Sequence, residues 1–449
     1  MRYIPHTNRD VRRMLETVGV KEVNRLFDSI PDEFKLKRAL ALPEPLDEQS
    51  LLNLMADLAS RNTTASAEKA VFLGAGAYAH HIPPVVDQML LRGEFFTAYT
   101  PYQPEASQGT LQAIFEYQSM MASLFGCEVV NASMYDGASS AAEALLMALR
   151  VQRKRKRLIV SRSTHPETLA VCRTYLSEAE QDIEELAFSP AGTCDLSTLG
   201  KTLDDDVAAV LVQQPDFLGC IEDLQEIAAL CRDAGAMLIV SVLEPVALGV
   251  LRAPGEQGAD IVTGEGMGIG AGLNFGGPGL GIFGCSQKKA WHMPGRLVGQ
   301  TYDDASRRGF VLTMATREQH IRRARATSNI CTNEGLCTLA TAVYLSLLGK
   351  QGFVELSRIN AANARAACER LCAVPGVERA FEAPFFNEFT LRLEKDVDHV
   401  LGELKRQGVV GGLALGRFYP DYGDCLLVCA TELNTAEQVE KMARGMESS

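Results

Sequence analysis

The chain has no lysine over a long central stretch. Of its 449 residues, those numbered 202–287 include none, and the gap lies between Lys201 and Lys288. An imine to a carbonyl compound requires a primary amine, so no side chain in this stretch binds a carbonyl cofactor covalently. The same stretch otherwise has the pattern of a catalytic core, with a buried strand at 237–242, an acidic residue at Glu244 and a second short strand at 258–262.

Long apolar runs and an excess of positive charge are also absent. The longest apolar helix candidate, 336–348, is shorter than the roughly 20 residues that a membrane span needs. The first seven residues contain no apolar region typical of a signal peptide. The chain has 44 basic and 56 acidic residues and a net charge of −12, which argues against nonspecific nucleic-acid binding. We therefore expect a soluble, cytoplasmic protein with no membrane and no nucleic acid among its partners.

The twelve cysteines show no metal-binding pattern. The closest pairs are Cys368 with Cys372, inside a helical pattern, and Cys425 with Cys429, on one face of a predicted strand. Neither spacing matches a structural zinc site. We expect no bound metal, and we interpret the cysteines as reduced and mostly buried thiols.

The pattern of apolar residues divides the chain into three parts. Residues 1–65 have short helical patterns interrupted by prolines and too little apolar content for an independent core, which predicts a helical arm lying on another surface. Residues 66–325 alternate short apolar strands with helices, which predicts a large α/β domain with a mostly parallel sheet covered on both faces. Residues 326–449 contain a core helix ending at Gly349, followed by short strands and helices, which predicts a smaller α+β domain with an antiparallel sheet.

Three motifs carry a resemblance to a known family. They are YTPYQPEASQGTLQ at 99–112, NASMYDGAS at 131–139, and RGFVLTMATREQHIRR at 308–323 followed by ATSNICTN at 326–333. Together they resemble the P-protein, the glycine decarboxylase of the glycine cleavage system. The resemblance extends over the whole chain and is nearest to subunit 1, the N-terminal half of the form that is split into two chains. It implies the fold of pyridoxal-phosphate (PLP)-dependent transferases of fold type I, which includes aspartate aminotransferase.

The resemblance also implies an activity and a division of labour. The family decarboxylates glycine on PLP and passes the aminomethyl group to the lipoyl arm of a carrier, the H-protein. In the two-chain form the cofactor lysine lies on subunit 2, and the segment of this chain that corresponds to the lysine region reads TGEGMGIG at 263–270. We therefore expect no cofactor bound covalently by this chain, no activity of the chain alone, and a complex with two copies of each subunit.

The resemblance places the best candidate site residues in the 99–109 loop. PLP enzymes of this fold build their sites at a dimer interface, so we expect Tyr99 and Tyr102 to be contributed to the active site of the partner. Stiff phenolic rings on a loop fixed by two prolines suit that role. A loop that only packs at the interface is the alternative. Further polar residues are candidates for lining the same site: Gln103, Glu105, Ser107 and His81.

A second group of residues marks a degenerate cofactor pocket. Asp136 and Ser139 begin a helix at the kind of turn that holds the PLP phosphate in this fold, although simple helix capping is favoured here. His165 lies where a ring stacks on the cofactor in related enzymes, and we interpret it as structural. Glu244 has the position of the acid that pairs with the pyridinium nitrogen, where the family more often has aspartate. Gly268 belongs to the segment without lysine.

Arginines near residue 320 and two lysines after the gap leave alternatives open. Arg317, Arg322 and Arg323 predict a basic stripe that docks the carrier or the other subunit, unless the arginines form a solvated or ion-paired face. A self-contained PLP decarboxylase or aminotransferase would need another lysine, and Lys288 and Lys289 are the nearest. A purely structural pseudoenzyme subunit is the third possibility.

Overall fold

The computed structural model describes residues 5–62, 70–177, 181, 183–274 and 276–449. The chain divides into two compact units, Met1–Thr63 and Thr64–Ser449. The smaller unit contains helix α1 (Asn8–Val18), a short 3-10 helix at Val23–Phe27, and helix α2 (Glu48–Ser60). Thr7 caps α1 through a reciprocal pair of hydrogen bonds with Asp10.

The larger unit is built on a seven-stranded sheet with the order β2-β8-β7-β6-β5-β3-β4. The pairs among β3, β4, β5, β6 and β7 are all parallel, and β8 runs antiparallel to β7 and β2. The strands are β2 (Val129–Val130), β3 (Arg157–Ser161), β4 (Ile183–Leu186), β5 (Val207–Gln213), β6 (Met237–Val242), β7 (Ile261–Glu265) and β8 (Gly281–Cys285). The mostly parallel α/β sheet that the sequence predicts is therefore confirmed.

Both faces of the central sheet are buried, which explains why its middle strands are apolar without interruption. Along β5, Val210 and Val212 pack into one core and Ala209 and Leu211 into the other. Helices α4, α8 and α10 contribute to the first core, and α5 and α6 to the second. The helices of this unit are α3 (Pro84–Leu90), α4 (Gln108–Phe125), α5 (Gly137–Val151), α6 (Pro166–Ser177), α7 (Leu196–Thr202), α8 (Leu224–Ala234), α9 (Gln319–Arg322), α10 (Gly335–Cys372), α11 (Val397–Arg406) and α12 (Ala436–Ser448).

The C-terminal part forms an antiparallel sheet with the order β11-β12-β15-β14, as expected from the sequence. Its strands are β11 (Val377–Arg379), β12 (Glu388–Leu393), β14 (Leu413–Ala414) and β15 (Cys425–Cys429). A short parallel pair joins β1 (Ala70–Val71) to β13 (Val409–Val410), and Phe72 packs in the same core. The residues just after position 69 therefore belong to this domain, although the sequence pattern assigns them to the central one.

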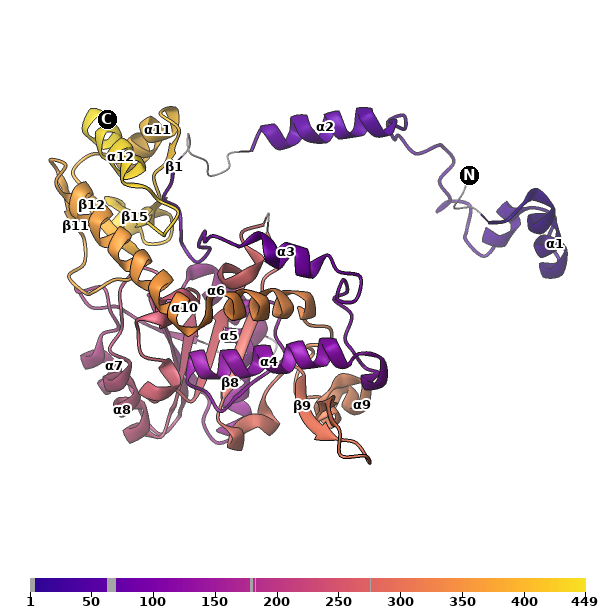
Figure 1. The fold of residues 1–449 in the computed structure, drawn as a ribbon, viewed down its shortest axis with the longest axis horizontal. Helices are drawn as coiled ribbons and strands as arrows, with labels where there is room; N and C mark the ends of the chain where they lie inside the picture. Colours follow the sequence, from indigo (N-terminus) through magenta and orange to yellow (C-terminus); the bar gives the residue numbers. More distant parts are fainter. Residues whose placement is uncertain (1–4, 63–69, 178–180, 182, 275) are drawn as a thin grey trace. The chain divides into compact units, whose positions relative to one another are not determined.

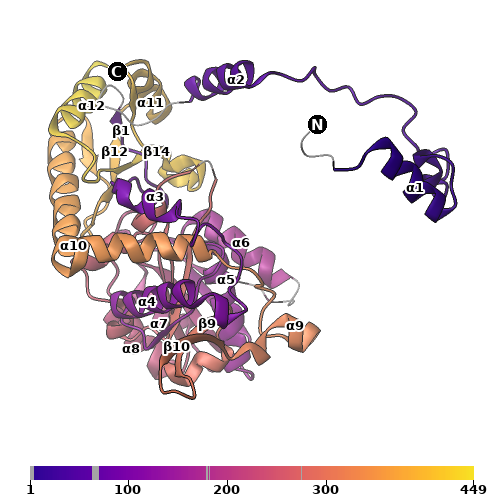
Figure 2. The ribbon, with the colours of Figure 1, turned by 45° about the vertical axis from the view of Figure 1, so that its right-hand side comes forward.

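Helix α10 runs from the core beside the seven-stranded sheet to the core beside the four-stranded sheet. Its backbone is not helical at Gly349, where φ is +60°, and Figures 1 and 2 show the helix changing direction along its length. The predicted helix end at Gly349 is thus a break within one long element. An antiparallel hairpin, β9 (Leu297–Tyr302) with β10 (Arg308–Thr313), was not predicted from the sequence. Within the described residues, no helix combines the length and apolar character of a membrane span.

Candidate functional site

The 99–109 loop places two tyrosine rings at the protein surface. Tyr99 is 74% exposed and Tyr102 is 45% exposed, and the two rings meet edge to face with centroids 6.3 Å apart. The loop precedes helix α4 and borders a pocket of about 430 Å³. Exposed aromatic rings of this kind on a proline-bounded loop are typical of surfaces that another molecule covers.

Arg296 fixes the position of Tyr102 from beneath the loop. Its side chain is 3% exposed, and its guanidinium carbon lies 5.0 Å from the centroid of the Tyr102 ring. The guanidinium of Arg296 donates a hydrogen bond to the hydroxyl of Tyr102 and another to Oγ1 of Thr100, the latter at 3.0 Å. Its Nε donates to Oε2 of Glu318 at 3.1 Å. Burial raises the pKa of Tyr102, and the nearby Arg296 opposes the shift. The phenol is therefore protonated, accepts from Arg296 and keeps its own proton for a further acceptor.

The remaining residues predicted to line this site lie in different places. Gln103 and Ser107 border the same pocket as the tyrosines, and Glu105 is exposed in the short 3-10 helix Pro104–Ala106. His81 is exposed near the C-terminal domain, where its backbone N–H donates to Glu432 Oε1 at 2.7 Å. His81 is therefore tied to a different region of the structure from the tyrosine loop.

Asp136 and Ser139 form the cap of helix α5. The Asp136 carboxylate accepts from the backbone N–H of Ser139 at 2.6 Å, and the Ser139 hydroxyl accepts from the Asp136 N–H at 3.2 Å. The two bonds make a reciprocal capping box, which satisfies N–H groups that a helix otherwise leaves free at its start. Both side chains are used within the helix end, in agreement with the capping interpretation.

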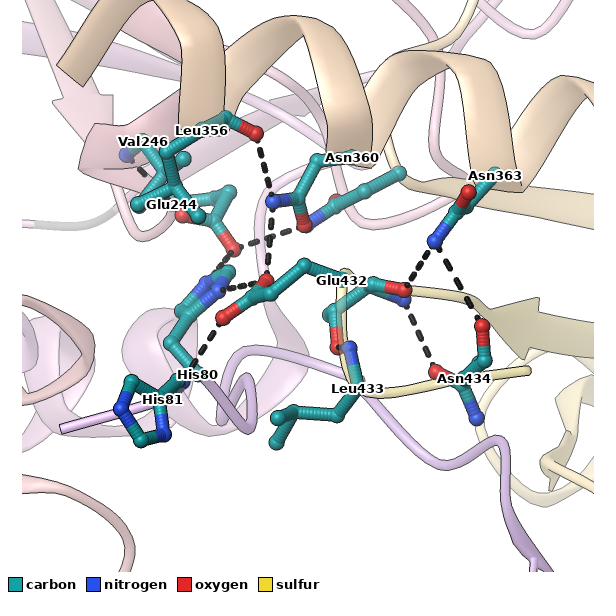
Figure 3. A network of polar contacts seen from close by, with 12 residues as sticks. His80, His81, Glu244, Val246, Leu356, Asn360, Asn363, Glu432, Leu433 and Asn434 are labelled. Atoms are coloured by element: carbon teal, nitrogen blue, oxygen red, sulfur yellow. Dashed lines mark hydrogen bonds and ion pairs between the residues drawn. The ribbon is translucent and has the colours of Figure 1, made fainter. Parts of the chain in front are cut away.

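Glu244 follows strand β6 and is buried in a polar network (Figure 3). Its Oε2 atom lies 2.9 Å from Nε2 of His80 and 2.9 Å from Nδ2 of Asn387. The other ring nitrogen of His80 lies 2.9 Å from Glu432. The His80 ring is thus held between two carboxylates, one from the central domain and one from the C-terminal domain.

The charge of His80 follows from these contacts. Burial opposes protonation, but the carboxylates of Glu244 and Glu432 outweigh it and raise the pKa of His80 to about 10. Although burial acts in the opposite direction, the hydrogen bond from His80 lowers the pKa of Glu432. At neutral pH His80 is therefore an imidazolium, and both of its N–H groups donate to carboxylates.

His165 and Gly268 complete the group that the sequence assigns to a degenerate pocket. Nε2 of His165 donates to the carbonyl of Ala75 at 2.9 Å, and the ring packs edge to face against Phe217 at 4.8 Å. Burial lowers the pKa of His165, so the ring is neutral. A Cβ atom placed on Gly268 would lie 3.2 Å from Cδ2 of His80, so this glycine faces the same network.

These residues do not fit PLP, the cofactor that the resemblance implies. The hydrogen-bonding groups of Glu244 and His165 are engaged by the chain itself, and Gly268 supplies no amine. Lys289 does not replace the missing lysine, because its Nζ pairs with Asp260 at 2.8 Å, just before the amino end of β7. Sites in folds of this class lie at the carboxyl ends of the strands. Among the described residues, no three histidine, cysteine or acidic side chains are grouped so as to bind a metal ion.

The predicted arginine stripe is only partly present at the surface. Arg322 and Arg323 are exposed, but Arg317 is buried and its guanidinium donates to the carbonyls of Met293 and Gly295. Including Arg317 in an exposed basic surface is therefore wrong. The reason is that the segment folds as three short helical turns rather than one helix, so Arg317 points inward.

Sequence reasoning did not identify Arg296, Glu265 or Glu432. All three act on a residue far away in the chain: Arg296 binds Tyr102 across 194 positions, Glu432 binds His80 across 352 and Glu265 binds Gly137 across 128. A local signal existed for Glu265, an acidic residue in the glycine-rich segment, and its side chain is partly buried.

Comparisons with known proteins agree on one family. The family model described as "Glycine cleavage system P-protein" matches residues 1–446. The chain is 48% identical to the "Probable glycine dehydrogenase (decarboxylating) subunit 1" of Rhizorhabdus wittichii, covering 100% of this chain and 99% of the relative. It is also 48% identical to the protein of the same name from Desulforamulus reducens, over 99% and 98% of the two chains.

Solved structures support the same assignment. A crystal structure of glycine decarboxylase (P-protein) of the glycine cleavage system, in inhibitor-bound form, superposes with a TM-score of 0.90 at 42% identity and covers 100% of both chains. A sphingosine-1-phosphate lyase from Burkholderia pseudomallei shares the fold, with a TM-score of 0.69 at 14% identity over 93% and 94% of the two chains. The chain belongs to the glycine cleavage system P-protein family.

Proposed function

We propose that this chain is the subunit of a two-chain glycine decarboxylase that does not hold the PLP. The observation that carries the proposal is the match, over nearly the full length of both chains, to proteins named as subunit 1 of that enzyme. In this proposal a homologous chain, subunit 2, provides the cofactor lysine, and two copies of each chain assemble. The complex decarboxylates glycine and transfers the aminomethyl group to the lipoyl arm of the H-protein. The twelve free thiols support a location in the cytoplasm.

The tyrosine loop is the part of this chain that reaches the active site of the partner. Tyr102 is anchored by the buried Arg296 and is itself 45% exposed, so another molecule can approach its ring and use the proton of its hydroxyl. Holding a donor in place before substrate arrives lowers the entropy cost of using it. Tyr99 contacts the same ring edge to face and adds a second exposed aromatic ring to this surface. In this proposal the polar side chains that line the site around the two tyrosines are those of Gln103, Glu105 and Ser107.

The N-terminal arm supplies a second surface for the partner. None of the residues of α2 is buried, although the helix contains four leucines and a methionine. Leu51, Leu52, Leu54, Met55 and Leu58 are each between 44% and 58% exposed. Exposed apolar area of this extent is typical of a protein interface. We assign the lysine-bearing subunit as its occupant, because the family builds its sites between homologous chains.

The exposed arginines near α9 provide the docking surface for the carrier. Arg322 and Arg323 lie on one turn of an otherwise acidic protein with a net charge of −12. A local basic surface on an acidic molecule attracts a negatively charged partner and raises the rate of encounter. An acidic H-protein fits that requirement.

The experiment that tests this function uses the chain alone and mixed with its lysine-bearing partner. Exchange of the glycine carboxyl group with bicarbonate is measured in the presence of H-protein, together with PLP retained after dialysis. We expect both exchange and retained cofactor only in the mixture. Exchange or retained cofactor with the isolated chain would contradict the assignment, because a lysine outside the gap would then hold PLP.

A further inference from the structure

The start of helix α5 offers an anion site, and a carboxylate of the chain fills it. Oε2 of Glu265 accepts from the backbone N–H of Gly137 at 3.0 Å, at the first residue of α5. Its Oε1 accepts from the N–H groups of Met267 and Leu280 at 2.9 and 2.7 Å. Backbone N–H groups that converge at a helix start are the arrangement that binds a phosphate in this fold. Here they converge on the partly buried carboxylate of a glutamate of the chain.

A side chain of the protein also takes the partner role toward Glu244. In PLP enzymes of this fold, the acid at this position accepts a hydrogen bond from the ring nitrogen of the cofactor. In this chain the bond to Glu244 comes from Nε2 of His80, a cationic ring N–H like that of a protonated pyridine. The second oxygen of Glu244 accepts from the N–H of Val246 at 3.0 Å. Both carboxylate oxygens are thus engaged.

Residues 75–81 lie against both His165 and Gly268. Cδ2 of His80 faces Gly268, which belongs to the segment that contains the cofactor lysine in PLP-binding relatives. The carbonyl of Ala75 binds the ring of His165, and a Cβ on Gly76 would lie 2.6 Å from that ring. The imidazole that would stack on a cofactor is therefore covered by the chain itself.

Two carboxylates of the C-terminal domain hold residues 75–81 in this place. Glu388 accepts from the N–H of Ala75 at 2.6 Å and from the hydroxyl of Tyr78 at 2.9 Å. Glu432 accepts from Nδ1 of His80 at 2.9 Å and from the N–H of His81 at 2.7 Å. The segment is anchored along its length and is not a surface loop that happens to lie near the pocket.

We propose that this subunit fills the PLP pocket of its own fold, with the Glu265 carboxylate in the phosphate position and the His80 ring in the position of the pyridine. The inference rests on the proposed function and deepens it, because it makes exclusion of PLP a built feature of the pocket and not only a result of the missing lysine. Supplying a lysine alone then does not create a cofactor site. Removing the two occupying side chains does.

The first test supplies the lysine in two backgrounds. Gly268→Lys is compared with the triple variant Gly268→Lys, His80→Ala, Glu265→Ala, each treated with PLP, reduced with borohydride and weighed by mass spectrometry. We expect no adduct at position 268 in the single variant and one per chain in the triple variant, located by peptide mapping. Stoichiometric labelling at position 268 of the single variant would overturn the proposal, as would a folded triple variant that takes up none.

A second test does not depend on the triple variant folding. Glu265→Ala is compared with Glu256→Ala, a change at an exposed glutamate, and the thermal midpoint of each is measured with inorganic phosphate against chloride at equal ionic strength. We expect phosphate to raise the Tm of Glu265→Ala and to leave the Tm of Glu256→Ala and of the unmodified chain unchanged. An equal rise for the unmodified chain, or none for Glu265→Ala, would overturn the proposal. Exchange activity of the unmodified chain with its partner tests the proposed function separately, and its failure would leave these results intact.

Discussion

At the scale of single residues, Tyr102 carries the sharpest expectation for activity. Replacing it with phenylalanine removes the free O–H and keeps the ring that packs on Tyr99. Loss of one hydrogen bond to a polar or charged group in the reacting complex corresponds to about a tenfold loss of rate. We expect the assembled complex with Tyr102→Phe to lose glycine–bicarbonate exchange by about that factor or more, with unchanged assembly.

Arg296 provides the internal check on this expectation. Arg296→Lys keeps a charge but loses the planar fork that binds Tyr102 and Thr100 together. If Arg296 acts by positioning Tyr102, the double variant Arg296→Lys, Tyr102→Phe loses less exchange rate than the two single variants together would predict, because both changes remove the same contribution. Tyr175→Phe, a change on α6, serves as the matched control and should leave exchange unchanged. Fully additive losses would contradict the positioning role.

His80 gives the stability of the protein a specific pH dependence. The pKa of His80 is raised from 6.5 to about 10 in the folded protein, because its ion pairs outweigh the cost of burial. The folded state therefore holds a proton that the unfolded state releases, and the stabilisation is complete below pH 6.5 and lost as the pH rises toward 10. Over this range the free energy of unfolding falls with a slope that approaches about 1.4 kcal/mol per pH unit. Urea unfolding at several alkaline pH values should show that the free energy of unfolding declines less with pH in His80→Gln than in the unmodified chain. Equal declines in the two proteins would contradict the assignment to His80.

How far the sequence predicts individual residues depends on where their partners lie. Tyr99 and Tyr102 were proposed as site residues because they belong to a long local motif that resembles the family, and the structure shows both of them exposed. Glu244 was identified by its place after a buried strand, but its partner His80 lies 164 positions earlier. The pairing depends on how the domains fold together, and no local pattern encodes it.

At the scale of elements, helix α2 predicts how the arm contributes to assembly. Leu51→Asp with Met55→Asp places two charges on one face of α2, since positions four apart lie together on a helix. Each apolar side chain that becomes buried in an interface contributes about 1.5–3 kcal/mol. We expect the affinity for the lysine-bearing subunit to fall at least about tenfold, measured by sedimentation or calorimetry, while unfolding of the isolated chain is unchanged.

The control for this expectation lies on the same helix. Asn53→Asp with Ser60→Asp adds the same charge at polar positions of α2 and should leave the affinity nearly intact. If both double variants weaken the complex equally, the effect is one of net charge and the apolar face has no specific role.

Elements with continuous apolar residues or clear caps were predicted well from the sequence. Strand β6 has the expected bounds, 237–242, and α5 starts at Gly137 as expected. Strand β4 was missed because its sequence, Ile-Glu-Glu-Leu, carries two acids at the edge of the sheet. The β9–β10 hairpin was missed because its strands are partly exposed and have little apolar alternation.

At the scale of the whole molecule, the charge pattern predicts a salt-dependent encounter with the carrier. Arg322→Glu with Arg323→Glu reverses the exposed basic surface. We expect about a tenfold higher KM for the lipoylated H-protein at low ionic strength, a smaller difference at high salt, and an unchanged rate at saturation. Arg153→Glu with Lys154→Glu makes the same charge change at another exposed place and should have little effect. Equal effects of the two double variants would exclude a specific docking surface.

Helix α10 has a consequence for how the larger unit opens. Tyr344 packs in the core of the central domain and Leu371 in that of the C-terminal domain, while Asn360 donates to Glu432 beside His80. One element and one buried ionic network thus belong to both lobes, so neither lobe unfolds alone without exposing charges. The two lobes should behave as a single foldon. In hydrogen-exchange mass spectrometry, backbone amides of β6 and β15 should share one opening free energy, and earlier exchange of β15 would show that the lobes open separately.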